Sequence, residues 1–322
     1  MELLGEKNYQ KLMDSIVIPF LDTRKKAGTF EPVKGQKLYY EHFRADEPVG
    51  IVVMLHGFSE AIDKLKETAY YFVREGFHVW MLQQREHGRS FRSTDDPALI
   101  HIVNYEDLVR DLHLFVETVV KKNPEASRFP RYLFAHSMGG GVSSRCLEEY
   151  PDDFEKAVLS SPMLELNTGG TPVWAAAAYS NLMRLLGRGK AYMPGSAPFS
   201  GKEDFANSAS NCRERYLYWL SRQRKHPEFQ MCVSAIATGI QFLRLTREAT
   251  LPENCAKVKA QVLLFQAGHD TFVSPGGQDT FIRQIGKKGR IVRMPDAKHE
   301  IYLSKNEDLR RYWEEILAFL KG

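Results

Sequence analysis

The segment 132–149 limits the fold of this chain more strictly than any other stretch of its sequence. An apolar run of strand character at 132–134 leads to Ser137, three consecutive glycines begin at Gly139, and residues with helical spacing follow. A serine at the tip of so tight a strand-to-helix turn needs small residues two positions away on either side, and Ala135 and Gly139 meet this need. A flexible glycine loop would rarely lie between a clean strand and a clean helix. We therefore predict a nucleophile elbow with Ser137 as the nucleophile.

Strands and helices alternate along the chain on both sides of this turn. Short apolar runs predict strands at 51–55, 79–82, 132–134, 157–159, 262–266 and 290–294. Runs with a period near 3.6 residues predict helices at 65–75, 105–122 and 309–320. A hairpin over 29–43 precedes the first of these strands. This order is typical of an α/β protein whose mostly parallel central sheet has helices on both faces.

The alternation stops between residues 163 and 256. Two apolar runs at 173–186 and 231–245 and an aromatic, basic run at 213–224 predict helices, and no strand is needed there. We interpret this stretch as a helical cap, or lid, inserted into the sheet domain. The predicted organisation is therefore a first part of the core at 1–162, the cap at 163–256 and a second part of the core at 257–322.

Composition limits the partners and the location that the chain can have. A formal charge of +4 on 322 residues gives no reason to expect nucleic-acid binding, and it allows no more than transient contact with an anionic membrane surface. No apolar window approaches the roughly 18 residues of a membrane span, and the first residues lack the pattern of a signal peptide. The four cysteines are widely scattered and predict reduced thiols. We therefore expect a cytoplasmic protein, at most peripheral to the inner face of the membrane.

A nucleophilic serine needs a histidine that takes its proton and a carboxylate that orients this histidine. Asp270 follows the predicted strand 262–266, and His299 follows the predicted strand 290–294. The order serine, acid, histidine is the one expected with a nucleophile elbow, and the gap before the acid has room for the cap. We predict that Ser137, Asp270 and His299 form a catalytic triad.

Three other residues are weaker candidates for the acid and the base. His269 adjoins Asp270 and is expected to point away from it, while Asp296 lies too close to His299 in the sequence. His136 is expected to pack under the turn rather than to act as the base.

The oxyanion that forms during acyl transfer needs two backbone N–H donors. One is expected from Met138, directly after the nucleophile, and the other from Phe58, in a loop where Gly57 allows close approach of the backbone. Glu60 is expected to anchor this loop from inside, with a solvated carboxylate as the alternative. Such a mechanism needs no cofactor and no metal, and the ten histidines show no pairing at metal-ligand spacing.

These motifs resemble the lysophospholipase and monoacylglycerol lipase family of α/β hydrolases. The segments that carry the resemblance are 87–90, 104–111, 135–140, 161–163, 268–273 and 299–301. One departure is that Gln83 or Gln84 stands where the family usually has an aspartate. The resemblance covers residues 30–320 and implies the α/β-hydrolase fold. It also implies hydrolysis of the carboxylic ester of a monoacyl lipid, a lysophospholipid or a monoacylglycerol, through an acyl-enzyme on Ser137.

The cap leaves the substrate less well defined. An apolar channel for one acyl chain is predicted to be lined by Trp174, Tyr179, Leu182 and Met183, with simple packing of the cap onto the sheet as an equal alternative. Four arginines in the run 213–224 could meet a phosphate head group, although such charges more often lie on a solvated helix face: Arg213, Arg215, Arg222 and Arg224.

Other activities remain open on the same fold. They are a small-ester carboxylesterase, a proline-type aminopeptidase and, in another class, a non-catalytic ligand-binding protein. An aminopeptidase needs acidic residues near its pocket to hold a free amine, and the stretch 170–200 has none. A complete triad with two oxyanion donors argues against a binding protein without activity.

Overall fold

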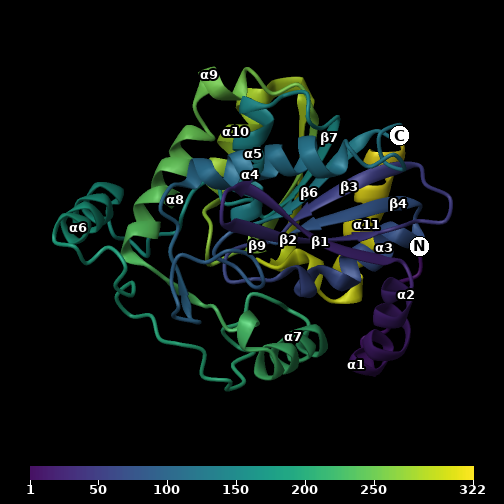
Figure 1. Ribbon diagram of the computed structural model, residues 1–322, viewed down its shortest axis with the longest axis horizontal. Coiled ribbons are helices and arrows are strands. Elements are labelled where there is room, and N and C mark those ends of the chain that lie inside the picture. The colour runs from purple at the N-terminus through teal and green to yellow at the C-terminus, as the bar shows by residue number, and fades with distance from the viewer.

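The computed structural model describes residues 1–322, and its centre is an eight-stranded sheet (Figure 1). The strand order is β1-β2-β4-β3-β6-β7-β9-β10. The pairs β1–β2 and β2–β4 are antiparallel, and every other pair is parallel. The strands are β1 (Lys25–Val33), β2 (Gln36–Phe43), β3 (Gly50–Leu55), β4 (Phe77–Leu82), β6 (Arg131–His136), β7 (Lys156–Ser160), β9 (Gln261–His269) and β10 (Gly289–Lys298). The mostly parallel sheet predicted from the sequence is confirmed.

Helices cover both faces of this sheet (Figure 1). One face carries α4 (Tyr105–Phe115) with the π-helical turn Val116–Val120, α5 (Met138–Glu149) and α10 (Pro275–Ile285). The other face carries α1 (Tyr9–Leu12), the π-helical turn Met13–Val17, α2 (Ile18–Asp22), α3 (Lys66–Arg74) and α11 (Asn306–Lys321). Short 3-10 turns lie at Ile62–Leu65, Pro227–Phe229, Gly286–Lys288 and Ile301–Leu303. α10 is not among the helices expected from the sequence, and its first turn contains two glycines, which are typical of loops.

The central strands have apolar sequences because both of their faces are buried, as β3 illustrates. In β3, Ile51, Val53 and Leu55 pack into the hydrophobic cluster under α4 and α5. Val52 and Met54 point the other way and pack into the cluster under α3 and α11. Since both faces of the strand are covered by helices, no position is left for a polar side chain.

The middle region, predicted as the cap, contains four helices and one short strand. The helices are α6 (Val173–Leu185), α7 (Arg213–Lys225), α8 (Ile236–Glu248) and α9 (Pro252–Cys255). The strand is β8 (Val233–Ser234), which pairs in parallel with β5 (Leu99–Ile100) outside the central sheet. The expectation that this region needs no strand is therefore wrong. β8 directly precedes α8, and its partner β5 lies in the segment between β4 and α4.

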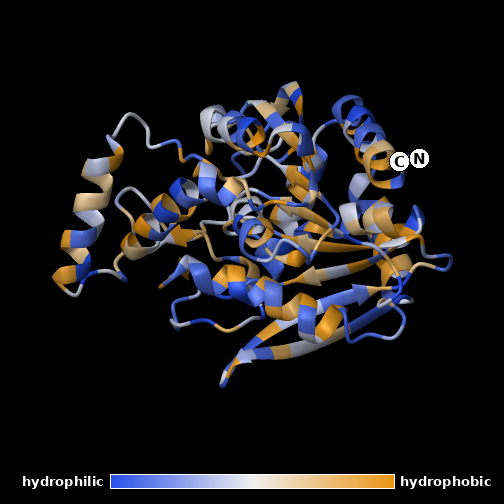
Figure 2. Ribbon diagram, turned by 90° about the horizontal axis from the view of Figure 1, so that it is seen from above, coloured by the Kyte–Doolittle hydropathy of each residue, from blue (hydrophilic) through white to orange (hydrophobic).

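One helix of this region lies at the outer end of the molecule. Both ribbon views place α6 at one end, beyond α8 (Figures 1 and 2). Its apolar side chains Trp174, Leu182 and Leu185 are 75%, 55% and 81% exposed. No helix in the structure has the length and apolar character that crossing a membrane requires. All four cysteines are unpaired, as predicted.

Candidate active site

Ser137 lies in the turn between β6 and α5, with φ 51° and ψ −118°. A positive φ is strained for a residue with a side chain, and such strain is concentrated at functional turns. A Cβ atom on Gly139 would lie 2.5 Å from the carbonyl oxygen of His56, and one on Gly140 would lie 2.6 Å from the Cβ of Pro162. The small residues of this turn are therefore required by the chain segments that follow the neighbouring strands β3 and β7.

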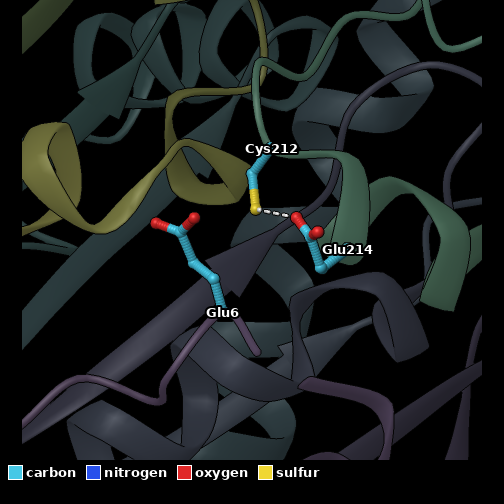
Figure 3. Close-up of side chains that lie close together, drawn as sticks. All are labelled: Glu6, Cys212 and Glu214. Atoms are coloured by element: carbon cyan, nitrogen blue, oxygen red, sulfur yellow. Dashed lines mark hydrogen bonds between the residues drawn. The ribbon is translucent and has the colours of Figure 1, made fainter. Parts of the chain in front are cut away.

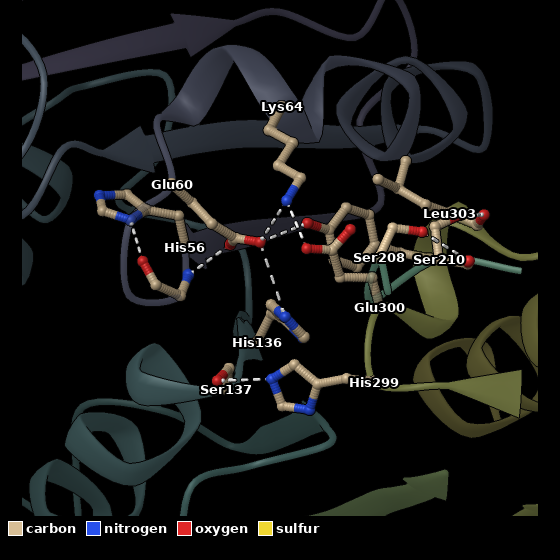
Figure 4. Close-up of polar contacts among 12 residues, drawn as sticks. His56, Glu60, Lys64, His136, Ser137, Ser208, Ser210, His299, Glu300 and Leu303 are labelled. Atoms are coloured by element: carbon tan, nitrogen blue, oxygen red, sulfur yellow. Dashed lines mark hydrogen bonds and ion pairs between the residues drawn. The ribbon is translucent and has the colours of Figure 1, made fainter. Parts of the chain in front are cut away.

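The three residues predicted as a triad meet beside this turn. The Nε2 atom of His299 lies 2.8 Å from the Oγ atom of Ser137 (Figure 4), and its Nδ1 atom lies 2.6 Å from an Oδ2 atom of Asp270. Asp270 follows β9 and His299 follows β10. These two strands pair in parallel, so their carboxyl ends bring both loops to the same edge of the sheet.

The surroundings of Asp270 favour its ionised form. Its Oδ1 atom accepts hydrogen bonds from the N–H groups of Phe272 and Val273, at 2.9 and 3.0 Å. Burial opposes the charge, but these bonds and the contact with His299 hold the pKa of Asp270 below its ordinary value. A carboxylate facing Nδ1 of His299 keeps the imidazole proton on that atom. Nε2 is then free to accept the proton of Ser137.

The weaker candidates lie where the sequence analysis expects them. The ring of His136 is 4.8 Å from the ring of His299, centre to centre, and its Nδ1 atom lies 3.1 Å from the carbonyl oxygen of Ser160. Burial lowers the pKa of His136 to about 3, so this imidazole is neutral. His269 and Asp296 are exposed and do not hydrogen-bond to His299.

The two N–H groups predicted for the oxyanion hole have no acceptor within the chain. The N–H of Phe58 donates to no other group, and Met138 begins α5, where an N–H has no partner inside the helix. Both residues adjoin the site, since Phe58 lines the cavity beside Ser137. Glu60 anchors this loop, because its Oε2 atom accepts a hydrogen bond of 2.6 Å from the N–H of Gly57. The solvated alternative for Glu60 is wrong, since the residue is 3% exposed.

Two glutamines hold the oxyanion loop from the opposite side. The backbone N–H of Gln84 donates to Nε2 of His56 at 3.0 Å, and its side-chain amide donates to the His56 carbonyl at 2.6 Å. The Oε1 atom of Gln83 accepts from the N–H of Ile62 at 3.2 Å. Because Nε2 of His56 is an acceptor, this ring is neutral, and burial lowers its pKa to about 4. These glutamines take the place of the aspartate that the resemblance leads one to expect.

A cavity of about 190 Å³ opens beside Ser137. Its apolar side chains come from the oxyanion loop, the start of the cap, α8 and the loop after Asp270: Phe58, Met163, Leu166, Phe242, Phe272 and Val273. A second cavity of about 580 Å³ is lined by residues of α6, α8 and α10 and shares Leu166 with the first. The two cavities therefore adjoin at Leu166, and the second has a mixed lining that includes Glu165, Arg244 and Arg247.

The prediction for the cap residues needs a correction. None of the four lines either cavity: Trp174, Tyr179, Leu182 and Met183. α6 turns Val173 and Ala177 towards the second cavity and leaves Trp174 largely in solvent. A helix that is apolar nearly all round does not reveal which face is packed. Sequence reasoning also missed Phe242, which lies in a helix without a distinctive motif, and Phe272, although Phe272 belongs to the segment 268–273 that carries the resemblance.

The arginines of α7 do not form a head-group site as a set. Arg215 is fully buried, and its Nε and Nη2 atoms donate to both carboxylate oxygens of Glu67, at 2.9 and 2.8 Å. Its Nη1 atom donates to the carbonyl of Ser304 at 3.0 Å. Arg213 pairs with Glu203 at the surface. The interpretation as a solvated helix face is therefore wrong for Arg215, which fastens the cap to the core.

Two groups of residues of metal-ligand type lie outside the active site, and one of them is formed by Glu6, Cys212 and Glu214 (Figure 3). The thiol of Cys212 donates to a carboxylate oxygen of Glu214 at 3.6 Å, and burial raises the pKa of this thiol. Glu6 accepts a hydrogen bond of 2.6 Å from the N–H of Asn306. A protonated thiol and an engaged carboxylate are poor metal ligands. These three residues instead hold together the N-terminal segment and the starts of α7 and α11.

The chain is similar to known proteins over most of its length. Residues 46–306 match the family described as "Serine aminopeptidase, S33". The chain is 24% identical to the monoacylglycerol lipase of Mycolicibacterium smegmatis, over 87% of this chain and 92% of that protein. It is 26% identical to the probable lysophospholipase L2 of Haemophilus influenzae, over 88% of both chains. The crystal structure of a soluble variant of monoglyceride lipase from Saccharomyces cerevisiae superposes with a TM-score of 0.71, at 18% identity over 92% of this chain and 94% of that chain.

The fold and the serine turn define an α/β hydrolase. The chain belongs to the family described as "Serine aminopeptidase, S33", whose match includes the sheet from β3 to β10, the region predicted as the cap, and Ser137, Asp270 and His299. Its full-length relatives are named as a lipase and a lysophospholipase, and the chain is accordingly an enzyme of the carboxylic ester hydrolase class. The α/β-hydrolase fold and the family resemblance predicted from the motifs are confirmed.

Proposed function

We propose that this chain hydrolyses the carboxylic ester of a monoacyl lipid, a lysophospholipid or a monoacylglycerol, through an acyl-enzyme on Ser137. The observation that carries the proposal is the continuous hydrogen-bonded series Ser137–His299–Asp270, at 2.8 and 2.6 Å, beside a cavity with apolar walls. One relative is named for monoacylglycerols and another for lysophospholipids, so the relatives support both substrate classes equally.

The proposed reaction has two halves. In the first, His299 takes the proton of Ser137 while the Oγ atom attacks the ester carbonyl carbon, and the N–H groups of Phe58 and Met138 receive the oxyanion. The imidazolium, stabilised by Asp270, then gives its proton to the departing alcohol, which leaves an acyl group on the serine. In the second half, a water molecule loses a proton to His299 and attacks the acyl-enzyme. The fatty acid is released and the serine hydroxyl is restored.

The walls of the two cavities support a substrate with one acyl chain. About 190 Å³ beside Ser137 is less than the roughly 300 Å³ of a small ligand pocket, and taken alone it would suit a short ester. The second cavity adjoins the first at Leu166, and its apolar lining residues include Val173 and Ala177 of α6. We propose that the acyl chain follows this path beneath the cap.

An aminopeptidase is the second candidate, because the family carries that name. The cavity beside Ser137 does contain two carboxylates, those of Glu60 and Glu300. Lys64 pairs with both of them, so neither carboxylate is free to hold the amine of a peptide. The pairing with Lys64 therefore favours an ester over a peptide as the substrate.

α6 gives a reason to propose transient contact with an anionic lipid surface, where such substrates reside. Residues 173–200 include no acidic residue and three basic ones, Arg184, Arg188 and Lys190. Exposed Trp174 and Leu185 lie on the same helix. Arg184 lies in α6, and Arg188 and Lys190 follow directly after this helix. A basic segment beside exposed aromatic and aliphatic side chains is typical of proteins that rest on membranes.

The first test asks whether Ser137 is the nucleophile. A fluorophosphonate probe should label the wild-type chain at Ser137, and the variant Ser137→Ala should not react. Rates on soluble esters should fall by at least about 10⁴-fold in this variant, since its base has no hydroxyl to activate. Equal labelling of both proteins would contradict the proposal.

The second test concerns the substrate. Activity on p-nitrophenyl esters should rise with acyl-chain length, and lysophosphatidylcholine or monooleoylglycerol should be hydrolysed in preference to aminoacyl amides. A clear preference for acetyl and butyryl esters would indicate a small-ester carboxylesterase. Turnover of aminoacyl amides alone would indicate a peptidase.

A further inference from the structure

Three charged side chains that the proposed reaction leaves unused meet at one wall of the active-site cavity, whose lining includes both glutamates: Glu60, Lys64 and Glu300 (Figure 4). The Nζ atom of Lys64 lies 3.2 Å from Oε1 of Glu60 and also pairs with Oε1 of Glu300. The three side chains are only 3%, 8% and 14% exposed, in chain order. Removing one partner of a buried ion pair is costly, because the remaining charge is left without compensation.

One end of this cluster reaches the oxyanion loop. The Oε2 atom of Glu60 accepts from the N–H of Gly57 at 2.6 Å, and its Oε1 atom accepts from the hydroxyl of Tyr302 at 2.7 Å. Burial opposes the charge of Glu60, but the ammonium of Lys64 holds the pKa of this carboxyl well below its ordinary value. The next N–H along the chain is that of Phe58, one of the two proposed oxyanion donors. The position of the Glu60 carboxylate therefore sets the direction of this donor.

The other end reaches the loop that carries the catalytic histidine. Glu300 follows His299 directly, and its backbone N–H donates to the carbonyl of Ala209 at 2.9 Å. The hydroxyl of Ser210 donates to the carbonyl of Leu303 at 2.7 Å. The chain before α7 thus holds one side of the histidine loop through its backbone. The side that faces the oxyanion loop is held by the pair of Lys64 and Glu300.

From this geometry we propose that Lys64 is a positioning residue, which fixes the oxyanion loop and the His299 loop relative to each other by pairing with Glu60 and Glu300 at the same time. The inference rests on the proposed reaction at Ser137, and Lys64 itself touches neither Ser137 nor His299. Without its ammonium, two buried carboxylates repel each other, and the two loops that carry them move apart. A misplacement of about 1 Å in such a site can lower the rate about 100-fold.

The variant Lys64→Met removes the charge and keeps most of the volume of the side chain. We expect kcat to fall about 10- to 100-fold and KM to change less than about threefold, because Lys64 itself does not line the cavity beside Ser137. The variant Lys64→Arg restores the charge and should recover most of the lost kcat.

Lys66→Met is the matched control. Lys66 is also a buried lysine paired with a buried glutamate, Glu41, and it lies just two residues further along the chain. It has no contact with the active site, so this variant should lose stability to a comparable extent while its kcat stays within about twofold of the wild type. Equal losses of kcat in both methionine variants would overturn the proposal, since they would show a merely structural role.

A spectroscopic readout keeps the inference independent of the substrate. The Nδ1–H proton of His299, hydrogen-bonded to Asp270, should give a strongly downfield proton resonance in the wild type and in Lys66→Met. In Lys64→Met this resonance should shift or broaden. A wild-type chain that hydrolyses no ester, combined with a resonance that moves only in Lys64→Met, would contradict the proposed function and still support positioning. An unchanged resonance together with an unchanged kcat in Lys64→Met would overturn the positioning role alone.

Discussion

The helices α6 and α7 lie in the same region, the one predicted as the cap, and have the same length of 13 residues, yet their relations to the core are opposite. α7 sends Arg215 into the core, where it is fully buried and bonds Glu67 through two parallel hydrogen bonds. α6 exposes apolar side chains such as Trp174 and Leu185 to solvent, and it packs mainly on α8. A charged residue thus lies inside the protein while large apolar residues lie outside it.

The region predicted as the cap therefore has two parts: α7 is anchored to the core, and α6 is largely exposed. The chain that leads into α7 helps to build the site, because Asn211 accepts from the N–H of Lys305 at 3.0 Å and donates to the carbonyl of Asp296 at 3.1 Å, on both sides of the histidine loop. α6 is preceded by Gly169 and Gly170, both at positive φ and with open space around them. We therefore expect substitutions in the α7 region to change stability. Substitutions in α6 should change binding to a lipid surface and the rate on substrate that lies in that surface.

The largest effect should come from Arg215→Met. This change leaves the carboxylate of Glu67 buried without its partner, which costs about 3–5 kcal/mol of unfolding free energy. The variant Arg213→Met removes a surface ion pair from the same helix and should cost less than about 1 kcal/mol. Urea unfolding of both variants gives the comparison. Similar losses in the two would show that α7 is no more firmly anchored than an ordinary surface helix.

A smaller effect should appear in the dependence of stability on pH. Burial lowers the pKa of His87, which lies under the cap, to about 3. Because the unfolded chain binds this proton near pH 6.5 and the folded chain does not, stability falls as the pH drops from about 6.5 towards 3. One such histidine contributes about 1.4 kcal/mol for each pH unit. The burial of Glu148, whose pKa is raised to about 7, acts in the opposite direction above pH 4.5.

The variant His87→Gln isolates this contribution. Unfolding free energies at pH 6.5, 5.5 and 4.5 should show a slope lower than that of the wild type by about 1.4 kcal/mol per pH unit. An identical slope in the two proteins would mean that His87 is protonated in the folded state, and that the α7 side of the cap admits water to this position.

The smallest effect on stability should come from the double variant Trp174→Ser with Leu185→Ser. Both side chains are largely exposed, so the unfolding free energy should stay within about 0.5 kcal/mol of the wild type for each change. Binding to anionic phospholipid vesicles and the rate on vesicle-borne substrate should fall several-fold, while the rate on a soluble ester is kept. A comparable fall on the soluble ester would mean that α6 acts at the catalytic cavity, as the sequence suggested.

The sheet and the proposed triad could be predicted from the sequence because their signals are local. Apolar runs mark the central strands, and Ser137, Asp270 and His299 each follow one of them. The sequence could not show that α7 is anchored to the core while α6 is exposed. Arg215 resembles its neighbours in α7 until Glu67, far away in the sequence, is seen beside it. Lys64 gave no signal either, since its partner Glu300 lies 236 positions further along the chain.

The central claim is that an ester passes through a covalent bond to the turn serine. The direct measurement is to mix the enzyme with a long-chain p-nitrophenyl ester, quench in acid within the first turnover and map the peptides by mass spectrometry. The account predicts an acyl group on the peptide that contains Ser137, and none on that peptide in Ser137→Ala. Rapid hydrolysis with no acylated serine, or with the acyl group on another residue, would contradict it.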